Sequence, residues 1–450
     1  MNLLLLLAGV RVWSGTPVEW ITRVFLAVSL FSLEMQLVTW TGLATLWTLV
    51  PLNAVVAAGL FVWYRRKPRD QAAGDALEVL RPAWPALAVL MLVVVTLNVA
   101  TPLGTADPYH LQRAERIGSV GTLAYDSSVH PKLNVLGWLY ELLLADVAAV
   151  PVFGGSMLRL HGAAGLVFFA LTIGAVMHLL GRSSRLGWCL LLSVPAVFHQ
   201  FVLVKNDLFG AMPALVVLAW LVTRVSIAPP IEIAWAMWLT GIAFGMKLTS
   251  FPLALVAAAA IAVAHSTDGK RMGAAAIGGL VGLMAGGLLF TLVENMRVYG
   301  SIVEPIRGLG NRTASVAEAF TSVVRYLLSL FDLGALTRRW WPGRGGWGAT
   351  YGLPFVWAMG VLFYARRQPD VRRTLWLAAA YGIAFAAVYP DADVAHRLVL
   401  APGLLVIAVA AVVAQRESSV PGWMQPAGFA VAALSGVQVA RSVVLYWVRA

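Results

Sequence analysis

The chain has 450 residues, of which 60% are apolar and only 12% are charged. A water-soluble domain carries about a quarter charged residues, so this composition argues against a soluble protein. The apolar runs lack the alternation of an outer-membrane barrel strand. The net charge of +12 indicates basic cytoplasmic loops and contact with membrane lipids, and we expect no nucleic-acid partner.

Repeated apolar runs predict an all-α polytopic membrane protein with about 11 to 13 transmembrane helices. The first stretch, "MNLLLLLAG", lacks a basic start and a small-residue cleavage site, so we expect it to be retained and not removed as a signal peptide. The spanning helices are expected at 18–36, 43–63, 84–101, 158–180, 187–203, 208–223, 230–246, 250–266, 273–293, 354–365, 375–390, 398–414 and 424–445.

Basic residues occur in the loops at every second turn, and short basic loops lie in the cytoplasm. These loops are "RRKPRD" (65–70), "GRSSR" (181–185), Arg224, "DGKR" (268–271), "RRQPDVRR" (366–373) and "QRES" (415–418). The intervening loops are therefore expected to face outward, and they are 101–157, 204–207, 247–249, 294–353 and 391–397.

Two outward segments, 132–150 and 314–333, are apolar but carry charges, which predicts amphipathic helices at the membrane interface. In the first of them the charges are Glu141 and Asp146. We divide the chain into an N-terminal helix pair with a basic cytoplasmic loop (1–80), a catalytic transmembrane core (81–415) and a C-terminal transmembrane segment (416–450).

Ionisable residues recur at the outward ends of the predicted helices, where they are costly unless they face an aqueous cavity. We therefore treat them as candidate site residues. They are Asp107, Tyr109, His110 and Arg113 in "ADPYHLQRAERIGSVGTL", Lys205, Asn206 and Asp207 in "VLVKND", Lys247 in "GMKLTS" and Arg397 in "DADVAHRL".

Each of these residues also has a simpler interpretation. Asp107 can cap a helix that begins at Pro108, and Arg113 can extend to lipid headgroups. Lys205 and Asp207 can form a surface ion pair of little value, and Lys247 can also extend to headgroups. The spacing of His, Cys and Asp residues does not resemble a tetrahedral metal site, and no nucleotide-binding loop is present.

Together these motifs resemble the membrane glycosyltransferases of the GT-C class, and within it family 39, which includes protein O-mannosyltransferases and bacterial aminoarabinose transferases. The Asp-x-x-Tyr-His start of the first outer loop is similar to "ADPYH", and "LVKNDLFG" resembles the Lys-Asn-Asp helix of bacterial relatives. Further matches are "GIAFGMKLTS", "NMRVYGSIVEP" and "HRLVLAPGLL". The sequence departs from the family pattern at Pro108, where many relatives carry an acid, and at Ser301, where Asn is usual.

The resemblance implies a GT-C-type bundle that transfers a sugar from a polyprenyl-phosphate donor to a glycan, lipid or protein acceptor. It implies an active site on the periplasmic or exterior side of a bacterial inner membrane. Asp107 would be the general base, with inversion at the anomeric carbon, or would hold a divalent metal such as Mg or Mn. Arg113, Lys205, Lys247 and Arg397 would stabilise the departing phosphate, and Tyr109 and His110 would position the sugar or orient Asp107.

Two other functions remain open from the sequence. A lipid or solute transporter, including a flippase, would place charged groups along a pathway open to both sides. A non-catalytic membrane scaffold would use its polar outer loops only to bind a partner. Convergence of Asp107, Lys205, Lys247 and Arg397 around one outward cavity would favour the enzyme.

Overall fold

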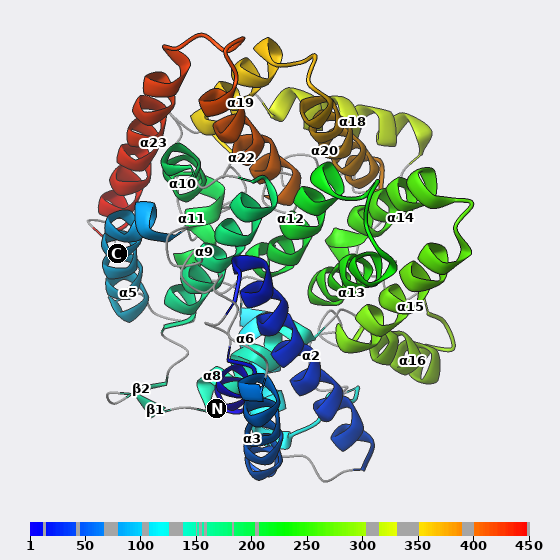
Figure 1. Ribbon diagram of the computed structural model, residues 1–450. Helices are drawn as coiled ribbons and strands as arrows, with labels where there is room; N and C mark the ends of the chain where they lie inside the picture. Colours follow the sequence, from blue (N-terminus) through cyan, green and yellow to red (C-terminus); the bar gives the residue numbers. More distant parts are fainter. Residues whose placement is uncertain are drawn as a thin grey trace.

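The chain is helical throughout the part that the computed structural model describes, apart from one antiparallel pair of two-residue strands (Figure 1). The described residues are 1–11, 15–41, 46–66, 80–100, 108–125, 138–149, 151–152, 155–156, 160–181, 184–202, 207–302, 315–330, 351–388 and 400–447. The predicted all-helical class is confirmed at this level.

The first part of the chain forms α1 (Asn2–Gly9), α2 (Pro17–Thr41), α3 (Leu49–Arg66), η1 (Arg81–Ala83), α5 (Trp84–Ala100), α6 (Pro108–Val120), α8 (Leu139–Ala148), β1 (Pro151–Val152) and β2 (Gly155–Ser156). The middle part forms α9 (His161–Leu179), α10 (Arg185–Leu192), α11 (Pro195–Val202), α12 (Asp207–Thr223), α13 (Pro230–Met246), η4 (Leu248–Ser250) and α14 (Phe251–His265). The last part forms α15 (Gly269–Ala285), α16 (Leu288–Tyr299), α18 (Val316–Ser329), α19 (Leu353–Tyr364), α20 (Pro369–Val388), α22 (Leu400–Arg416) and α23 (Met424–Trp447).

Among the described residues, four helical stretches are long and apolar enough to cross a membrane, or five if one bent pair is a single span. The four are 17–39, 81–99, 161–179 and 248–265. Other apolar helices have 10–17 residues, and at 1.5 Å per residue even 17 residues reach only about 25 Å, less than the roughly 30 Å hydrocarbon core. The expected number of spans therefore exceeds the number of helices with full spanning length.

Two predicted spans are broken helices. The segment 187–203 forms α10 and α11, which are separated at Ser193 and Val194. The segment 273–293 forms α15 and α16, which meet at an angle of 66°. The break falls at Gly286 and Gly287, and Gly287 has a φ of 76°, a conformation that favours glycine. The predicted N-terminal pair also gains a third helix, α1.

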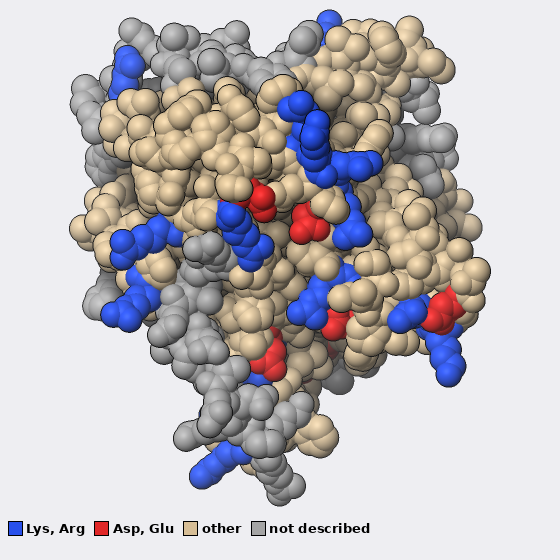
Figure 2. Space-filling model, turned by 45° about the horizontal axis from the view of Figure 1, so that its top comes forward, with Lys and Arg blue, Asp and Glu red and all other residues tan. Residues whose placement is uncertain are grey.

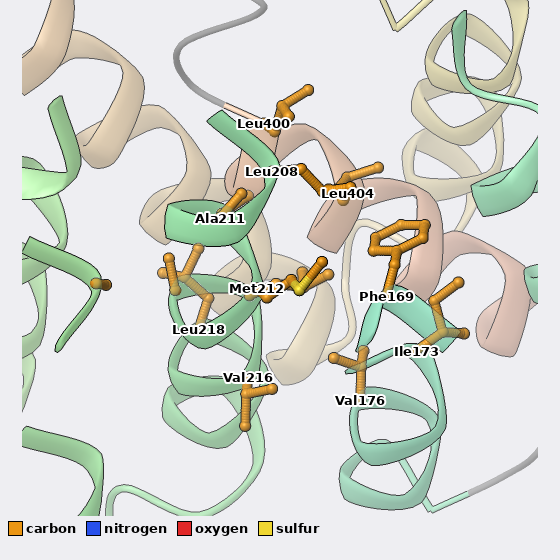
Figure 3. Close-up of a cluster of buried hydrophobic side chains, with 14 of the residues drawn as sticks. Phe169, Ile173, Val176, Leu208, Ala211, Met212, Val216, Leu218, Leu400 and Leu404 are labelled. Carbon is orange, nitrogen blue, oxygen red and sulfur yellow. The ribbon is translucent and has the colours of Figure 1, made fainter. Parts of the chain in front are cut away.

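The helix α12 is the centre of the bundle, because it is apolar on all sides and is buried along almost its entire length. A helix of this kind must be surrounded by other helices, and α12 packs on α9, α13 and α22. Figure 3 shows one part of this core, where Leu208 and Met212 of α12 lie near Phe169 of α9 and Leu404 of α22.

Glycines allow α13 and α15 to pack backbone against backbone. A Cβ atom on Gly278 would lie 2.1 Å from the carbonyl oxygen of Ala234, and one on Gly282 would lie 2.3 Å from that of Trp238. Gly286 packs in the same way beside Gly241. Small residues four positions apart let two helices approach this closely, as they do at membrane helix interfaces.

Described parts of five predicted cytoplasmic loops, those at 181–185, Arg224, 268–271, 366–373 and 415–418, lie at one end of the bundle, which we call the basic end. Most of the sixth, 65–70, lies outside the described residues. The turns of the basic end include those between α19 and α20 and between α22 and α23, at the top of Figure 1. Arg373 Nη1 donates to the carbonyl oxygen of Val222 over 3.2 Å, Arg271 Nε donates to that of Ala228 over 3.0 Å, and Arg416 Nη2 donates to that of Gly181 over 3.0 Å. Figure 2 shows Lys and Arg side chains around a few acids as this end comes forward.

Several other described helix ends meet at the opposite end. Asn98 of α5 donates to the carbonyl oxygen of Phe201 in α11 over 2.9 Å and accepts from the backbone of Gly162 in α9 over 2.8 Å. Gln36 of α2 donates to the carbonyl oxygen of Met284 in α15 over 2.8 Å. The contacts of Asn98 join helix ends next to the predicted outward loops, which alternate with the basic loops along the chain.

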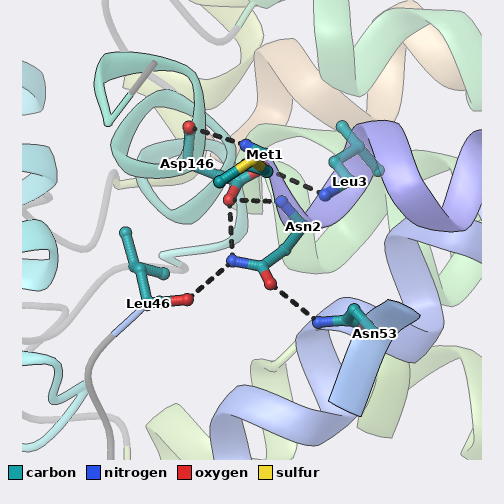
Figure 4. Close-up of polar contacts among 6 residues, drawn as sticks. All are labelled: Met1, Asn2, Leu3, Leu46, Asn53 and Asp146. Carbon is teal, nitrogen blue, oxygen red and sulfur yellow. Dashed lines mark hydrogen bonds and ion pairs between the residues drawn. The ribbon is translucent and has the colours of Figure 1, made fainter. Parts of the chain in front are cut away.

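The helix α8, predicted as an amphipathic helix at the membrane interface, is buried among other helices. Its residues from Leu139 to Asp146 are all buried, and both of its acids have partners inside the protein. Asp146 accepts hydrogen bonds from the backbone of Asn2 and Leu3, each over 2.9 Å, and from the amino group of Met1 over 2.8 Å (Figure 4). Asp146 therefore satisfies backbone donors at the start of α1, and it does not face lipid headgroups.

The close packing of α13 on α15 predicts that Gly282→Ala destabilises the fold by about 1–3 kcal/mol, because the new methyl group must displace backbone atoms. Gly273→Ala on the same helix is the matched control, since nothing lies within 4 Å of a Cβ atom there and alanine is the better helix former. Thermal unfolding in detergent measures both. Equal midpoints for the two variants would contradict the packing.

Candidate functional site

Four of the predicted site residues have described side chains, and these are His110, Arg113, Asp207 and Lys247. Tyr109 lies within α6, but its side chain is outside the described part. Asp107, Lys205, Asn206 and Arg397 also lie outside the described residues, so their predicted roles stay predictions. The site can be built from the first four and from the residues that contact them.

The helix α6 begins at Pro108, as the sequence predicts, and one of its faces packs on α8. His110 and Arg113 lie on this packed face and are buried, whereas Glu115 is exposed. His110 Nδ1 and Glu141 Oε1 of α8 are 2.6 Å apart, and their side chains are only 4% and 3% exposed. The pair therefore lies in the protein interior and not at a headgroup surface.

Arg113 brings a cation close to this pair. Burial lowers the pKa of Arg113 to about 10, although the charge of Glu141 opposes the change, so the guanidinium remains charged at neutral pH. Burial raises the pKa of Glu141, but its hydrogen bond to His110 and the charges of His110 and Arg113 outweigh this and lower it overall. The simpler interpretation of Arg113, extension to headgroups, is wrong because the side chain is buried.

Asp207 and Lys247 form the second charged pair of the site. Asp207 is the first residue of α12, and Lys247 follows the last residue of α13. Lys247 Nζ forms an ion pair with Asp207 Oδ1, and the two side chains are 11% and 2% exposed. Lys247 is therefore held within the protein and does not extend to headgroups. Asp207 belongs to a buried pair, and not to a surface pair of little value.

Aromatic rings connect the two charged pairs. The rings of His110 and Tyr140 have centroids 5.4 Å apart, and those of Tyr140 and Phe209 have centroids 5.2 Å apart. Phe209 lies in the first turn of α12, beside Asp207. The site thus brings together parts of α6, α8, α12 and α13 at the opposite end of the bundle.

A third polar side chain, Ser250, lies near the Asp207–Lys247 pair. A Cβ atom on Gly210 would lie 2.9 Å from Lys247 Cβ and 3.4 Å from Ser250 Oγ, so both side chains cross the same part of α12. Ser250 shares a hydrogen bond with the hydroxyl group of Tyr381 in α20. The structure therefore adds α20 to the site.

The sequence analysis did not select several residues of this end as site residues. Glu141 and Tyr140 of α8 are two of them. Glu294 of α16 is a third residue that was not selected. It forms an ion pair with Arg297 at 2.8 Å and accepts a hydrogen bond from the backbone of Tyr125 over 3.3 Å. An acid inside an apolar stretch was the available signal for Glu141 and Glu294.

The described part of the chain contains no group of three His, Cys, Asp or Glu side chains that could hold a metal ion. The predicted Mg or Mn site thus depends on Asp107, which lies outside this part. Four of the described ionisable side chains of the site lie in two pairs, His110 with Glu141 and Lys247 with Asp207. Such an arrangement supplies fixed, oriented dipoles beside which a polar headgroup can lie.

Comparison of the chain with protein-family models, curated proteins and solved structures finds no match. The interpretation of the site therefore depends on its own geometry.

The lowered pKa of Glu141 predicts an acid-sensitive fold. Because its folded-state pKa lies below the unfolded-state value, ionised Glu141 stabilises the protein above that value, and the stabilisation is lost as the pH falls through the folded-state pKa. Glu141→Gln should unfold more easily at neutral pH and lose less stability on acidification than the unchanged protein. Unfolding midpoints from about pH 7 to about pH 3 test this, with Glu115→Gln as the exposed control. Parallel curves for Glu141→Gln and the unchanged protein would contradict it.

The buried Asp207–Lys247 pair predicts strong coupling between its members. Lys247→Met leaves a buried carboxylate without its cation, so we expect a loss of about 3–5 kcal/mol in unfolding free energy, and a similar loss for Asp207→Asn. The double variant should lose clearly less than the two single losses combined, because no charge is left uncompensated. Denaturant unfolding of the four proteins measures the coupling. Additive losses would show that the two side chains act independently.

Proposed function

We propose that this protein is a multi-pass membrane glycosyltransferase with a GT-C-type bundle that uses a polyprenyl-phosphate sugar. The observation that carries the proposal is the convergence of buried ionisable groups from α6, α8, α12 and α13 at the end away from the basic loops. Because short basic loops lie in the cytoplasm, this site would face outward, in a bacterial inner membrane toward the periplasm.

In the proposed reaction, Asp107 removes the proton from an acceptor hydroxyl group, and the oxygen attacks the anomeric carbon of the sugar. The new glycosidic bond forms as the bond between the anomeric carbon and the phosphate oxygen breaks, with inversion. Polyprenyl phosphate leaves with the bonding electron pair. The acceptor is a glycan, a lipid or a protein.

The described pairs refine the roles of the cations. Lys247 has Asp207 as its partner and Arg113 lies beside Glu141, so in this proposal both act through the field of fixed pairs. Direct contact with the departing phosphate is assigned to Lys205 and Arg397. The ring nitrogen of His110 lies against Glu141. His110 is in the first turn of α6, which begins directly after Asp107 in the sequence. In this proposal His110 orients that end of α6.

One observation favours a second function, a lipid or solute transporter. The 66° bend between α15 and α16 is a broken apolar helix, and transporters form substrate sites from helices of this kind. The buried charged pairs His110–Glu141 and Asp207–Lys247, however, gather at one end of the bundle, whereas a transporter is expected to bind near the membrane midplane.

Asp107→Asn should abolish sugar transfer while leaving membrane insertion and folding intact, because the two side chains have nearly the same shape. The assay is incubation of the purified protein in lipid with a panel of radiolabelled polyprenyl-phosphate sugars and membrane acceptors. Glu115→Gln is the matched control, since Glu115 is exposed on α6, the helix that begins directly after Asp107 in the sequence, and it should retain transfer.

Two results would count against the proposal. Transfer by a well-folded Asp107→Asn protein would reject Asp107 as the base. Movement of the labelled lipid across the bilayer, without transfer from any donor, would favour the transporter.

A further inference from the structure

The turn between α19 and α20 is the most strongly basic exposed segment of the basic end. We call residues Ala365 to Arg373 the arginine turn. It carries four arginines, which are Arg366, Arg367, Arg372 and Arg373, and one acid, Asp370. All five of these side chains are exposed.

Two of the four arginines hold the turn in place. Arg366 Nη1 donates to the carbonyl oxygen of Phe363 over 2.9 Å, and its guanidinium lies 4.4 Å from the centroid of the Phe363 ring. Arg373 Nη1 donates to the carbonyl oxygen of Val222 and lies 3.9 Å from Asp370. The arginine turn is therefore attached both to its own helix and to α12.

The side chains of the other two arginines, Arg367 and Arg372, form no hydrogen bond or ion pair with another described residue. Arg372 lies in the first turn of α20, and Trp376 follows it by one helical turn on the same face. The indole of Trp376 is 73% exposed. A guanidinium and an exposed aromatic ring thus stand one above the other along the helix.

Two further exposed aromatic side chains, Phe363 and Tyr364, directly precede the turn, with exposed fractions of 62% and 44%. Exposed aromatic residues beside cations are typical of the level where lipid headgroups meet acyl chains. A matching ligand has a phosphate for the guanidinium groups and apolar chains for the rings. An anionic phospholipid has both.

The charge of the whole basic end favours such a ligand. Among the described residues of this end, the cations outnumber the acids. The cations are Arg185, Arg224, Lys270, Arg271, Arg366, Arg367, Arg372, Arg373 and Arg416, and the acids are Glu232, Asp268, Asp370 and Glu417. Arg224 and Arg271 have acidic partners, whereas Arg367 and Arg372 keep their charge available for a ligand.

We propose that the arginine turn binds the phosphate group of an anionic phospholipid, with Arg367 and Arg372 as the phosphate ligands and Trp376 against the acyl chains. The N-terminus of α20, which begins at Pro369, lies in the same turn, and helix N-termini favour anions. This proposal depends on membrane placement and not on sugar transfer, and the arginine turn lies at the end of the bundle away from the buried pairs His110–Glu141 and Asp207–Lys247.

The test compares the Arg367→Gln/Arg372→Gln double variant with the unchanged protein in detergent, to which phosphatidylglycerol, phosphatidylcholine or inorganic phosphate is added. Binding of a fluorescent phosphatidylglycerol and the shift in unfolding midpoint are measured. We expect phosphatidylglycerol to raise the midpoint of the unchanged protein and phosphatidylcholine not to. The double variant should bind phosphatidylglycerol roughly tenfold or more weakly, since each arginine near a lipid surface contributes substantially.

The matched control is Arg185→Gln/Lys270→Gln, which removes the same charge from exposed positions of the same end outside the arginine turn. It should retain binding. Equal losses in the two double variants would indicate diffuse attraction and overturn the site, as would unchanged binding by Arg367→Gln/Arg372→Gln. A midpoint shift with inorganic phosphate equal to that with phosphatidylglycerol would show a free-phosphate site and would also overturn the lipid assignment. Sugar transfer is not part of the readout, so failure here leaves the proposed function intact.

Discussion

The ion pair between Asp207 and Lys247 is the contact that aligns the centre of the bundle. The helix α12 is buried on all sides, and its first residue is a buried carboxylate. A carboxylate in apolar surroundings is costly without a partner, and Lys247 at the end of α13 supplies that partner. The pair therefore sets the height of α12 against α13. The glycine contacts of α13 with α15 then carry this alignment to the outer helices.

The two ends of the bundle use their charges differently. At the basic end, arginines cap backbone carbonyl groups of neighbouring turns, as Arg373 does at Val222 and Arg416 does at Gly181, and their side chains remain partly in solvent. At the opposite end, acids and bases from separate helices meet in buried pairs. Buried pairs are rigid and poorly screened by salt, which suits a chemical site. Solvated arginines suit the recognition of lipid headgroups.

The positions of the long apolar helices could be predicted from the sequence to within a few residues, as for α9, α12, α13 and α22. The bend between α15 and α16 could not be predicted from the sequence, because Gly286 and Gly287 are also compatible with a continuous helix. The ring of Trp138, which packs on Gly287, is known only from the tertiary structure. The burial of α8 could not be predicted either. An apolar helix with Glu141 and Asp146 has the composition of an interfacial helix, and only its neighbours show that both acids have internal partners.

The sequence alone determined the helical class and the alternation of basic loops, since both depend on local composition and on spacing along the chain. It also identified His110, Arg113, Asp207 and Lys247 as residues that need a polar environment. Only the tertiary structure decided what that environment is. His110 meets Glu141 across 31 positions of the chain, and Asp146 meets Asn2 across 144. Pairings of this kind follow from how the helices pack, because a residue's own neighbours in sequence do not reveal which distant charge lies against it.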